Sequence, residues 1–397
     1  MLEKYKEDIY KCAQCGVCRA KYTKEVRYVC PVREHTGGFE HYFARGRILI
    51  ARGILEGELN YSKRLAEAIY TCTMCGNCTQ QCGAKNLETG EPLFEPDKIT
   101  EAMRADILTH HPELVKKEYW TLLNSTKDFG NPWMQPRAAR RKWVKGLNAR
   151  DITKEKAEIL FFAGCTASLD PKLQPLVIAT FKIFEKAEVD FGILGEKEGC
   201  CGSVQRRVGD LSLFERLAKE NIRQFNELGI KIVVTSCAGC YRTFKKEYPE
   251  LGNLNFEVLH SSEYIERLLK EGRIKFTEEI NMRVTYHDPC HLGRHVGVYD
   301  PPRNVLKAIP GINLLEMYPN KSNSWCCGGG GGVRTAVPGL ASDIALDKLN
   351  YATEVGAEAI VTTCPFCESN IRLTIEKEES KLKIFDLTEM VAKAMGL

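Results

Sequence analysis

The chain has 397 residues, of which 44% are hydrophobic and 27% are charged, and its formal net charge at pH 7 is +4. This small excess of positive charge argues against a nucleic-acid-binding protein, and no stretch approaches the roughly 18 consecutive apolar residues of a membrane-spanning helix. The charged first segment, MLEKYKEDIYKC, has no apolar signal core, so we expect a cytoplasmic protein, which could lie at a membrane through a partner.

The 18 cysteines are the most informative feature of the composition. A secreted disulfide framework is one interpretation, but a chain of this length can form ordinary hydrophobic cores without such cross-links. The thiols are also grouped in CxxC and Cys-Cys motifs rather than dispersed. In a reducing cytosol such groups usually bind metal.

Two CxxCxxC runs lie near the N-terminus, and each is followed by a fourth cysteine, after eleven residues in the first run and after three in the second. The second run matches the bacterial [4Fe–4S] pattern, except that Gly83 replaces the usual proline. In that pattern the fourth cysteine binds the neighbouring cluster. Structural zinc, the alternative, prefers two CxxC pairs. We therefore predict two cubane clusters, one bound by Cys12, Cys15, Cys18 and Cys82 and the other by Cys72, Cys75, Cys78 and Cys30.

The segment between these runs, residues 31–71, has apolar residues at helical spacing, such as Ala44, Ile48 and Ala51. A two-cluster domain built from helices resembles the α-helical ferredoxin domain of succinate-dehydrogenase-type iron–sulfur subunits, and we expect such a domain over residues 1–130. A linker over 131–156 follows, because its first twenty residues contain six Arg or Lys and no acidic residue. This basic segment is expected to be solvated, or to contact an acidic partner.

The remaining ten cysteines form two copies of one five-cysteine pattern, and each cysteine of the second copy follows its counterpart by 125 to 127 residues. So small a drift over five positions indicates an internal repeat. Glu263 and Glu389, in corresponding segments, keep the same spacing. We expect the first repeat over 157–275 and the second over 276–397.

Each repeat is predicted to be an α/β unit, with strands that lead into cysteines at their carboxyl ends. In the first repeat the strands are EILFFAG before Cys165 and KIVVTS before Cys237. A helix is predicted over 210–228, capped by Asp210, and its counterpart is predicted to begin at Asp343. The glycines after the cysteine pairs, Gly202 and Gly328, are predicted to let the backbone bend closely around a cofactor. A phosphate-binding loop is the weaker interpretation of the run 328–332, because no GK[ST] follows it.

These motifs resemble the CCG (cysteine-rich) domain found in the B-type and D-type subunits of heterodisulfide reductase. The order of a two-cluster ferredoxin domain and two such repeats resembles the D-type subunit, and also the iron–sulfur subunits of glycolate oxidase and of anaerobic glycerol-3-phosphate dehydrogenase. The resemblance implies a multidomain α and α/β protein whose two repeats are related by a pseudo-twofold axis. It also implies two noncubane [4Fe–4S] clusters, the first bound by Cys165, Cys200, Cys201, Cys237 and Cys240 and the second by Cys290, Cys326, Cys327, Cys364 and Cys367.

The activity implied by the resemblance is reduction or formation of a small disulfide between the two noncubane clusters, with electrons that enter through the ferredoxin domain. The donor is expected to be a redox partner, such as a flavoprotein or a membrane cytochrome. The histidines beside Cys290, which are His287, His291 and His295, could supply protons, and Arg294 could bind an anionic group. Alternatively these residues only tune the cluster or cap local turns.

Two other functions remain open at this point. The chain could be a pure electron-transfer subunit for a flavin-dependent dehydrogenase of glycolate, lactate or glycerol 3-phosphate, or for a larger low-potential complex. No GxGxxG fingerprint follows a strand, so flavin is not expected on this chain. A zinc- or disulfide-stabilised scaffold is the remaining alternative.

Overall fold

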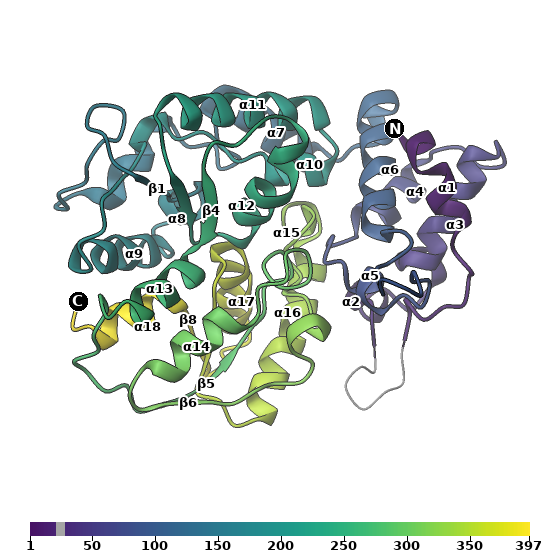
Figure 1. Ribbon diagram of the computed structural model, residues 1–397. Coiled ribbons are helices and arrows are strands. Elements are labelled where there is room, and N and C mark those ends of the chain that lie inside the picture. Colours follow the sequence, from purple (N-terminus) through teal and green to yellow (C-terminus); the bar gives the residue numbers. More distant parts are fainter. Residues whose placement is uncertain (21–27) are drawn as a thin grey trace. The chain divides into compact units, whose positions relative to one another are not determined.

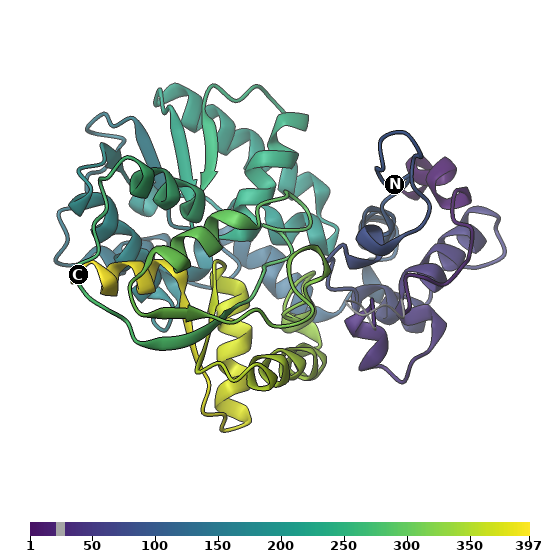
Figure 2. The same cartoon turned by 60° about the horizontal axis from the view of Figure 1, so that its bottom comes forward.

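The computed structural model describes residues 1–20 and 28–397, and residue contacts divide the chain into two units (Figure 1). Unit 1 contains Met1–Trp120, Val204–Leu211 and Tyr318–Lys348, and unit 2 contains Thr121–Ser203, Ser212–Met317 and Leu349–Leu397. The N-terminus therefore belongs to unit 1 and the C-terminus to unit 2 (Figure 2). Most of the insertion between Cys18 and Cys30 lies outside the described residues, and the domain boundaries expected at 130, 156 and 275 remain predictions.

Unit 1 is helical in its described residues, which confirms the prediction for residues 31–71. Pro31 and Pro96 occupy first-turn positions of α2 and α6, where a missing N–H and a fixed φ are favourable. The Ser62 hydroxyl caps α4 by accepting a hydrogen bond from the Leu65 N–H. The helices of the N-terminal segment are α1 (Lys6–Tyr10), α2 (Pro31–Glu34), α3 (Ala44–Leu55), α4 (Lys63–Tyr70), α5 (Asn77–Gln81) and α6 (Pro96–His110), and α7 (Lys117–Phe129) begins at its end.

Unit 2 contains two four-stranded parallel sheets with the same strand order. The first sheet runs β2-β1-β3-β4 and the second runs β6-β5-β7-β8, so each repeat builds the same sheet. Branched and aromatic residues fill the central strands and are buried. The strands are β1 (Ile159–Phe162), β2 (Phe191–Gly192), β3 (Ile232–Thr235), β4 (Glu257–His260), β5 (Met282–Tyr286), β6 (Ile312–Leu314), β7 (Ala359–Thr362) and β8 (Lys383–Asp386).

Helices from the two repeats pack against each other reciprocally in unit 2. The helix α9 (Gln174–Lys186) packs on α18 (Leu387–Ala394), and its counterpart α14 (Asp300–Ala308) packs on α13 (Ser261–Lys270), the counterpart of α18 (Figure 1). The aromatic ring of Phe184 and the side chains of Leu306 and Val391 belong to the resulting shared core. This exchange of equivalent contacts is what a pseudo-twofold axis produces, and it confirms that expectation.

Both α13 and α18 begin with a capping box, which explains why the spacing of Glu263 and Glu389 matches that of the cysteines. Glu263 accepts the His260 N–H, and Glu389 accepts the Asp386 N–H. The other helices of the repeats are α8 (Cys165–Leu169), α10 (Ser203–Val208), α11 (Leu211–Glu227), α12 (Ala238–Arg242), α15 (Val333–Ala336), α16 (Pro338–Glu354) and α17 (Pro365–Lys377).

One predicted helix start is wrong. The helix α16 begins at Pro338 rather than after Asp343, because proline is well suited to a first helical position. Asp343 lies on the exposed face of α16, while Ala341 and Ile344 are buried. Its counterpart α11 begins at Leu211, directly after Asp210 as predicted.

The basic segment before the first repeat is partly buried. Residues Arg137–Val144 form a 3-10 helix, and Trp143 packs in the core of unit 2. Arg140 is 1% exposed, so this side chain does not belong to a solvated basic surface. Among the described helices, none is both long and apolar enough to cross a membrane.

Candidate iron–sulfur sites

One cysteine set of unit 1 surrounds a cavity of about 330 Å³. Cys82 reaches this cavity from the end of α5, whereas Cys12, Cys15 and Cys18 come from the segment that follows α1. Burial raises the pKa of the Cys82 thiol, and the negative charges of Cys15 and Cys12 act in the same direction. Four thiols around one such space suit a [4Fe–4S] cluster. The cavity is lined by Cys12, Cys15, Cys18 and Cys82, together with Cys78.

The second cysteine set of unit 1 also gathers residues that lie far apart in sequence. Burial raises the pKa of Cys30 to about 11, and Cys72 and Cys75 contribute to this increase. Burial also raises the pKa of Cys78, with contributions from Asp97, Cys72 and Cys75. Cys30 therefore lies with the later run, and Cys82 with the earlier one, as the crossed ligand pattern requires. Thiols this buried are neutral unless a cation such as iron displaces the proton.

The first repeat brings its five cysteines into one group in unit 2. Cys165 begins α8 after β1, and Cys237 occupies the N-cap position of α12 after β3, so both follow strand carboxyl ends. Hydrogen bonds from Cys200 and Cys240 lower the pKa of Cys201 to about 6. Hydrogen bonding to Cys200, together with burial, raises the pKa of Cys165. The five cysteines thus form a connected set, in which Cys237 is half-buried and the other four are buried, and this set could hold a cluster.

Arg140 contributes a buried positive charge to this group, and sequence reasoning missed it. Its Nη2 donates a hydrogen bond of 3.0 Å to Cys165 Sγ, and its Nη1 donates one of 2.8 Å to Glu198 Oε1. Glu198 in turn accepts the N–H groups of Ala163 and Gly164, directly before Cys165. Burial lowers the pKa of Arg140, but Cys165 and Glu198 outweigh burial and hold it above its usual range. Only the basic character of residues 131–150 hinted at this role.

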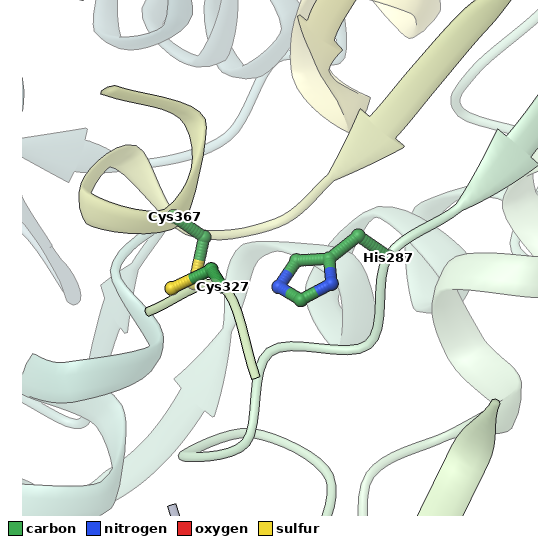
Figure 3. A group of neighbouring side chains, drawn as sticks. All are labelled: His287, Cys327 and Cys367. Carbon is green, nitrogen blue, oxygen red and sulfur yellow. The ribbon is translucent and has the colours of Figure 1, made fainter. Parts of the chain in front are cut away.

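The second repeat places His287 beside Cys367 within unit 2. Each of these two residues offers a ligand atom, and the two atoms lie within 4.8 Å of each other (Figure 3). Cys364 caps α17 after β7 and Cys367 lies in its first turn, which repeats the arrangement of Cys237 and Cys240. Cys290 lies in the turn after β5. A histidine predicted to supply protons is therefore also within reach of a metal held by this group.

The two repeats meet at equivalent cysteines. The Cys237 thiol hydrogen-bonds to Cys240 and to Cys364, its counterpart in the second repeat. Cys240 lowers the pKa of Cys237, but Cys364 and burial outweigh this effect and raise it. The contact lies where a pseudo-twofold axis brings equivalent positions together.

Two of the three predicted histidines lie near this meeting point. A Cβ placed on Gly239, between Cys237 and Cys240, would lie 3.8 Å from His291 Nδ1, so a histidine of the second repeat borders the CxxC motif of the first. The ring of His295 lies 5.2 Å from that of His291. Arg294 lies near Tyr299: burial raises the pKa of that phenol to about 12, and Arg294 opposes the increase.

Asp288 anchors the segment that carries these histidines. Its carboxylate accepts hydrogen bonds of 2.6 and 2.9 Å from Arg303, which is itself 3% exposed. A bidentate buried pair of this kind fixes the backbone between His287 and Cys290.

The glycines after the cysteine pairs are needed for helix packing. Gly202 has a φ of +86°, and a Cβ there would lie 2.7 Å from the ring of Phe214. Gly328 has a φ of +85°, and a Cβ there would lie 2.4 Å from the Ala341 carbonyl oxygen. Their predicted role in cofactor binding stays a prediction.

Comparison with known families finds an iron–sulfur domain in the N-terminal segment and a cysteine-rich domain in each repeat. A family model described as a 4Fe-4S dicluster domain matches residues 8–86, and one described as a cysteine-rich domain matches twice, at 159–245 and 284–372. The two matches of the second model confirm the predicted duplication.

Several curated relatives match nearly the whole chain. The chain is 32% identical to the D-type subunit of the dihydromethanophenazine:CoB–CoM heterodisulfide reductase of Methanosarcina mazei, across 98% of this chain and 95% of the relative. It is 30% identical to the probable iron-sulfur-binding oxidoreductase FadF of Bacillus subtilis, across 98% of this chain and 60% of that protein. It is 34% identical to the EtfAB:quinone oxidoreductase of Syntrophomonas wolfei, across 86% of this chain and 48% of that protein.

Proposed function

Since this chain belongs to the family of iron–sulfur oxidoreductase subunits that includes the D-type subunit of heterodisulfide reductase, we propose that it reduces a small disulfide to two thiols, or forms it in the reverse direction. The reduction consumes two electrons, supplied by a reduced redox partner, and two protons. The sulfur–sulfur bond breaks, and each sulfur leaves as a thiol.

One observation carries this proposal: both five-cysteine sets are complete, and they meet at equivalent residues, Cys237 and Cys364. A pure relay needs only one path for electrons. Two complete sets that adjoin across a pseudo-twofold axis suit a substrate with two equivalent reacting atoms, as a disulfide has. When bound in these sets, two noncubane [4Fe–4S] clusters would each supply one electron to the sulfur–sulfur bond.

The chain's own residues would bind the clusters and deliver the protons. In this proposal the two N-terminal cysteine sets would hold cubane clusters, which would supply a path for electrons from a flavoprotein or membrane-cytochrome partner, with no flavin on this chain. His291 is the best-placed proton donor, because its Nδ1 borders the CxxC motif of the first repeat and histidine exchanges protons near neutral pH. His287, His295 and Arg294 are further candidates, and we propose a cytoplasmic location for the protein.

A second candidate function is electron transfer without disulfide chemistry. It is favoured by the similarity to FadF and to a protein whose name describes electron transfer from EtfAB to quinone. In that case the partner would carry the flavin, and the paired cysteine sets would only pass electrons on.

Disulfide-dependent oxidation of a reduced viologen dye by the anaerobically purified, cluster-loaded chain separates these functions. We expect one disulfide to be consumed for every two dye molecules oxidised. Cys201→Ala and Cys327→Ala are each expected to reduce turnover by at least 100-fold while the cubane EPR signals persist. Full turnover in either variant contradicts the paired-site mechanism, and activity that requires an added flavoprotein supports the second function.

A further inference from the structure

Arg104 of α6 is a fully buried cation beside one of the N-terminal cysteine sets. Its exposed fraction is 0%, and among the described residues its guanidinium donates only to backbone carbonyl groups. The acceptors include Cys72 O at 2.7 Å and Ile69 O at 3.0 Å. Arg104 also donates to Arg207 O at 2.8 Å and to Gly331 O at 2.6 Å.

A second buried arginine, on α3, binds the same segment before Cys72. Arg47 is 3% exposed, and its Nη2 donates to Thr71 Oγ1 at 3.0 Å and to Ala68 O at 3.3 Å. Both guanidinium groups therefore contact the segment that ends in Cys72.

Neither arginine has a carboxylate partner within the described parts of the chain. The nearby buried carboxylates have other partners, because Glu101 pairs with Arg207 and Asp97 accepts the Thr79 hydroxyl. An uncompensated buried charge is strongly unfavourable. At this position, the negative charge of a [4Fe–4S] cluster and its four thiolates would compensate the positive charges of the two arginines.

We propose that Arg104 and Arg47 raise the reduction potential of the cluster bound by Cys30, Cys72, Cys75 and Cys78. This inference rests on the ligand sets proposed above. Reduction adds one negative charge to a cluster, so two fixed cations stabilise the reduced form more than the oxidised form. The negative charge of Asp97, near Cys78, would lower the reduction potential, but it is a single charge against two.

Arg104 is also a positioning residue, because its acceptors belong to three separate segments of unit 1. Gly331 follows the Cys-Cys-Gly motif of the second repeat, Arg207 follows that of the first, and Cys72 belongs to the cubane set. The Arg104 side chain therefore connects the loop that contains Cys72 to a segment from each repeat. We place this cluster on the electron route toward the repeats for that reason.

Arg45 provides the matched control. It lies beside the other cubane set, where its Nη1 donates to Gln14 O at 3.1 Å. Unlike Arg104, it is partly exposed and neutralised by Glu40, at 2.6 and 2.9 Å.

The test is an EPR-monitored redox titration of the cubane signals in the full chain, together with iron analysis. Arg104→Gln is expected to lower the midpoint potential of one cubane so that its reduced-to-oxidised ratio at a fixed solution potential falls at least tenfold, which is about 59 mV for a one-electron couple. Arg47→Gln is expected to shift the same signal, Arg104→Lys to shift it less, and Arg45→Gln to leave it in place.

An unchanged midpoint in a fully loaded Arg104→Gln protein overturns the inference. If that variant does not load its iron, Arg47→Gln decides, and an unchanged midpoint there overturns it as well. The titration uses dyes and dithionite without any disulfide, so its outcome is independent of whether the chain turns over a disulfide.

Discussion

At the scale of the single residue, the two cysteine-rich repeats differ more than their matching motifs suggest. Cys165 receives a hydrogen bond from the buried Arg140, which Glu198 orients. The position corresponding to Glu198 in the second repeat is Ser324, whose hydroxyl accepts a hydrogen bond from Lys348. The second repeat instead has His287 close to Cys367. The repeats thus share the positions of their cysteines but place different charges around them.

We predict that Arg140→Met destabilises the chain by about 3 kcal/mol, because it leaves the Glu198 carboxylate buried without its partner. The measurement is thermal unfolding under anaerobic conditions, with iron content determined in parallel. Arg150→Met is the matched control, because the Arg150–Asp190 pair lies at the surface of the same unit and is expected to contribute less than about 1 kcal/mol. Equal effects of the two substitutions would show that burial of the Arg140 pair is unimportant.

At the scale of the element, the glycine run 328–332 makes a close backbone approach. A Cβ at Gly331 would lie 2.4 Å from the Cys72 carbonyl oxygen, and one at Gly330 would lie 2.5 Å from that of Thr73. Gly331 also has a φ of +60°. The run therefore packs on the loop of unit 1 that contains Cys72 and Thr73. This packing accounts for the glycines without a phosphate-binding loop.

Gly331→Ala is accordingly expected to push this run away from Cys72 and to lower the iron bound per chain along with the melting temperature. The physical reason is that a contact at 2.4 Å forces the backbone to move, and a positive φ adds strain for alanine. Gly339→Ala, at the start of α16, is the control, because nothing lies within 4 Å of its Cβ. Normal iron content in Gly331→Ala would contradict the importance of this approach.

The cysteine spacings and the strand patterns could be interpreted from the sequence because they depend on local periodicity. The strands before Cys165 and Cys237 and the helix over 210–228 are of this kind. The duplication could be predicted because equivalent cysteines recur after 125 to 127 residues. Arg140 and Arg104 were not predicted, because their roles depend on contacts with residues far away in sequence, such as Glu198 and Gly331. The start of α16 at Pro338 was missed because Asp343 offered a plausible cap inside a longer helix.

At the scale of the whole molecule, duplication explains why the chain has ten cysteines in its repeats. Parallel sheets of the same order place cysteines after β1, β3, β5 and β7, and the exchange of α9–α18 and α14–α13 contacts relates the repeats by a pseudo-twofold axis. Cys237 and Cys364 meet as a consequence. We therefore propose that both repeats, as well as the N-terminal segment, carry clusters.

Iron and acid-labile sulfide per chain, measured on anaerobically purified protein, test this central proposal most directly. Four [4Fe–4S]-type clusters predict about 16 of each per chain. A value of about 8 from protein whose cubane signals are fully developed would mean that only the N-terminal sets bind clusters. That result would contradict the proposed chemistry at the paired repeats.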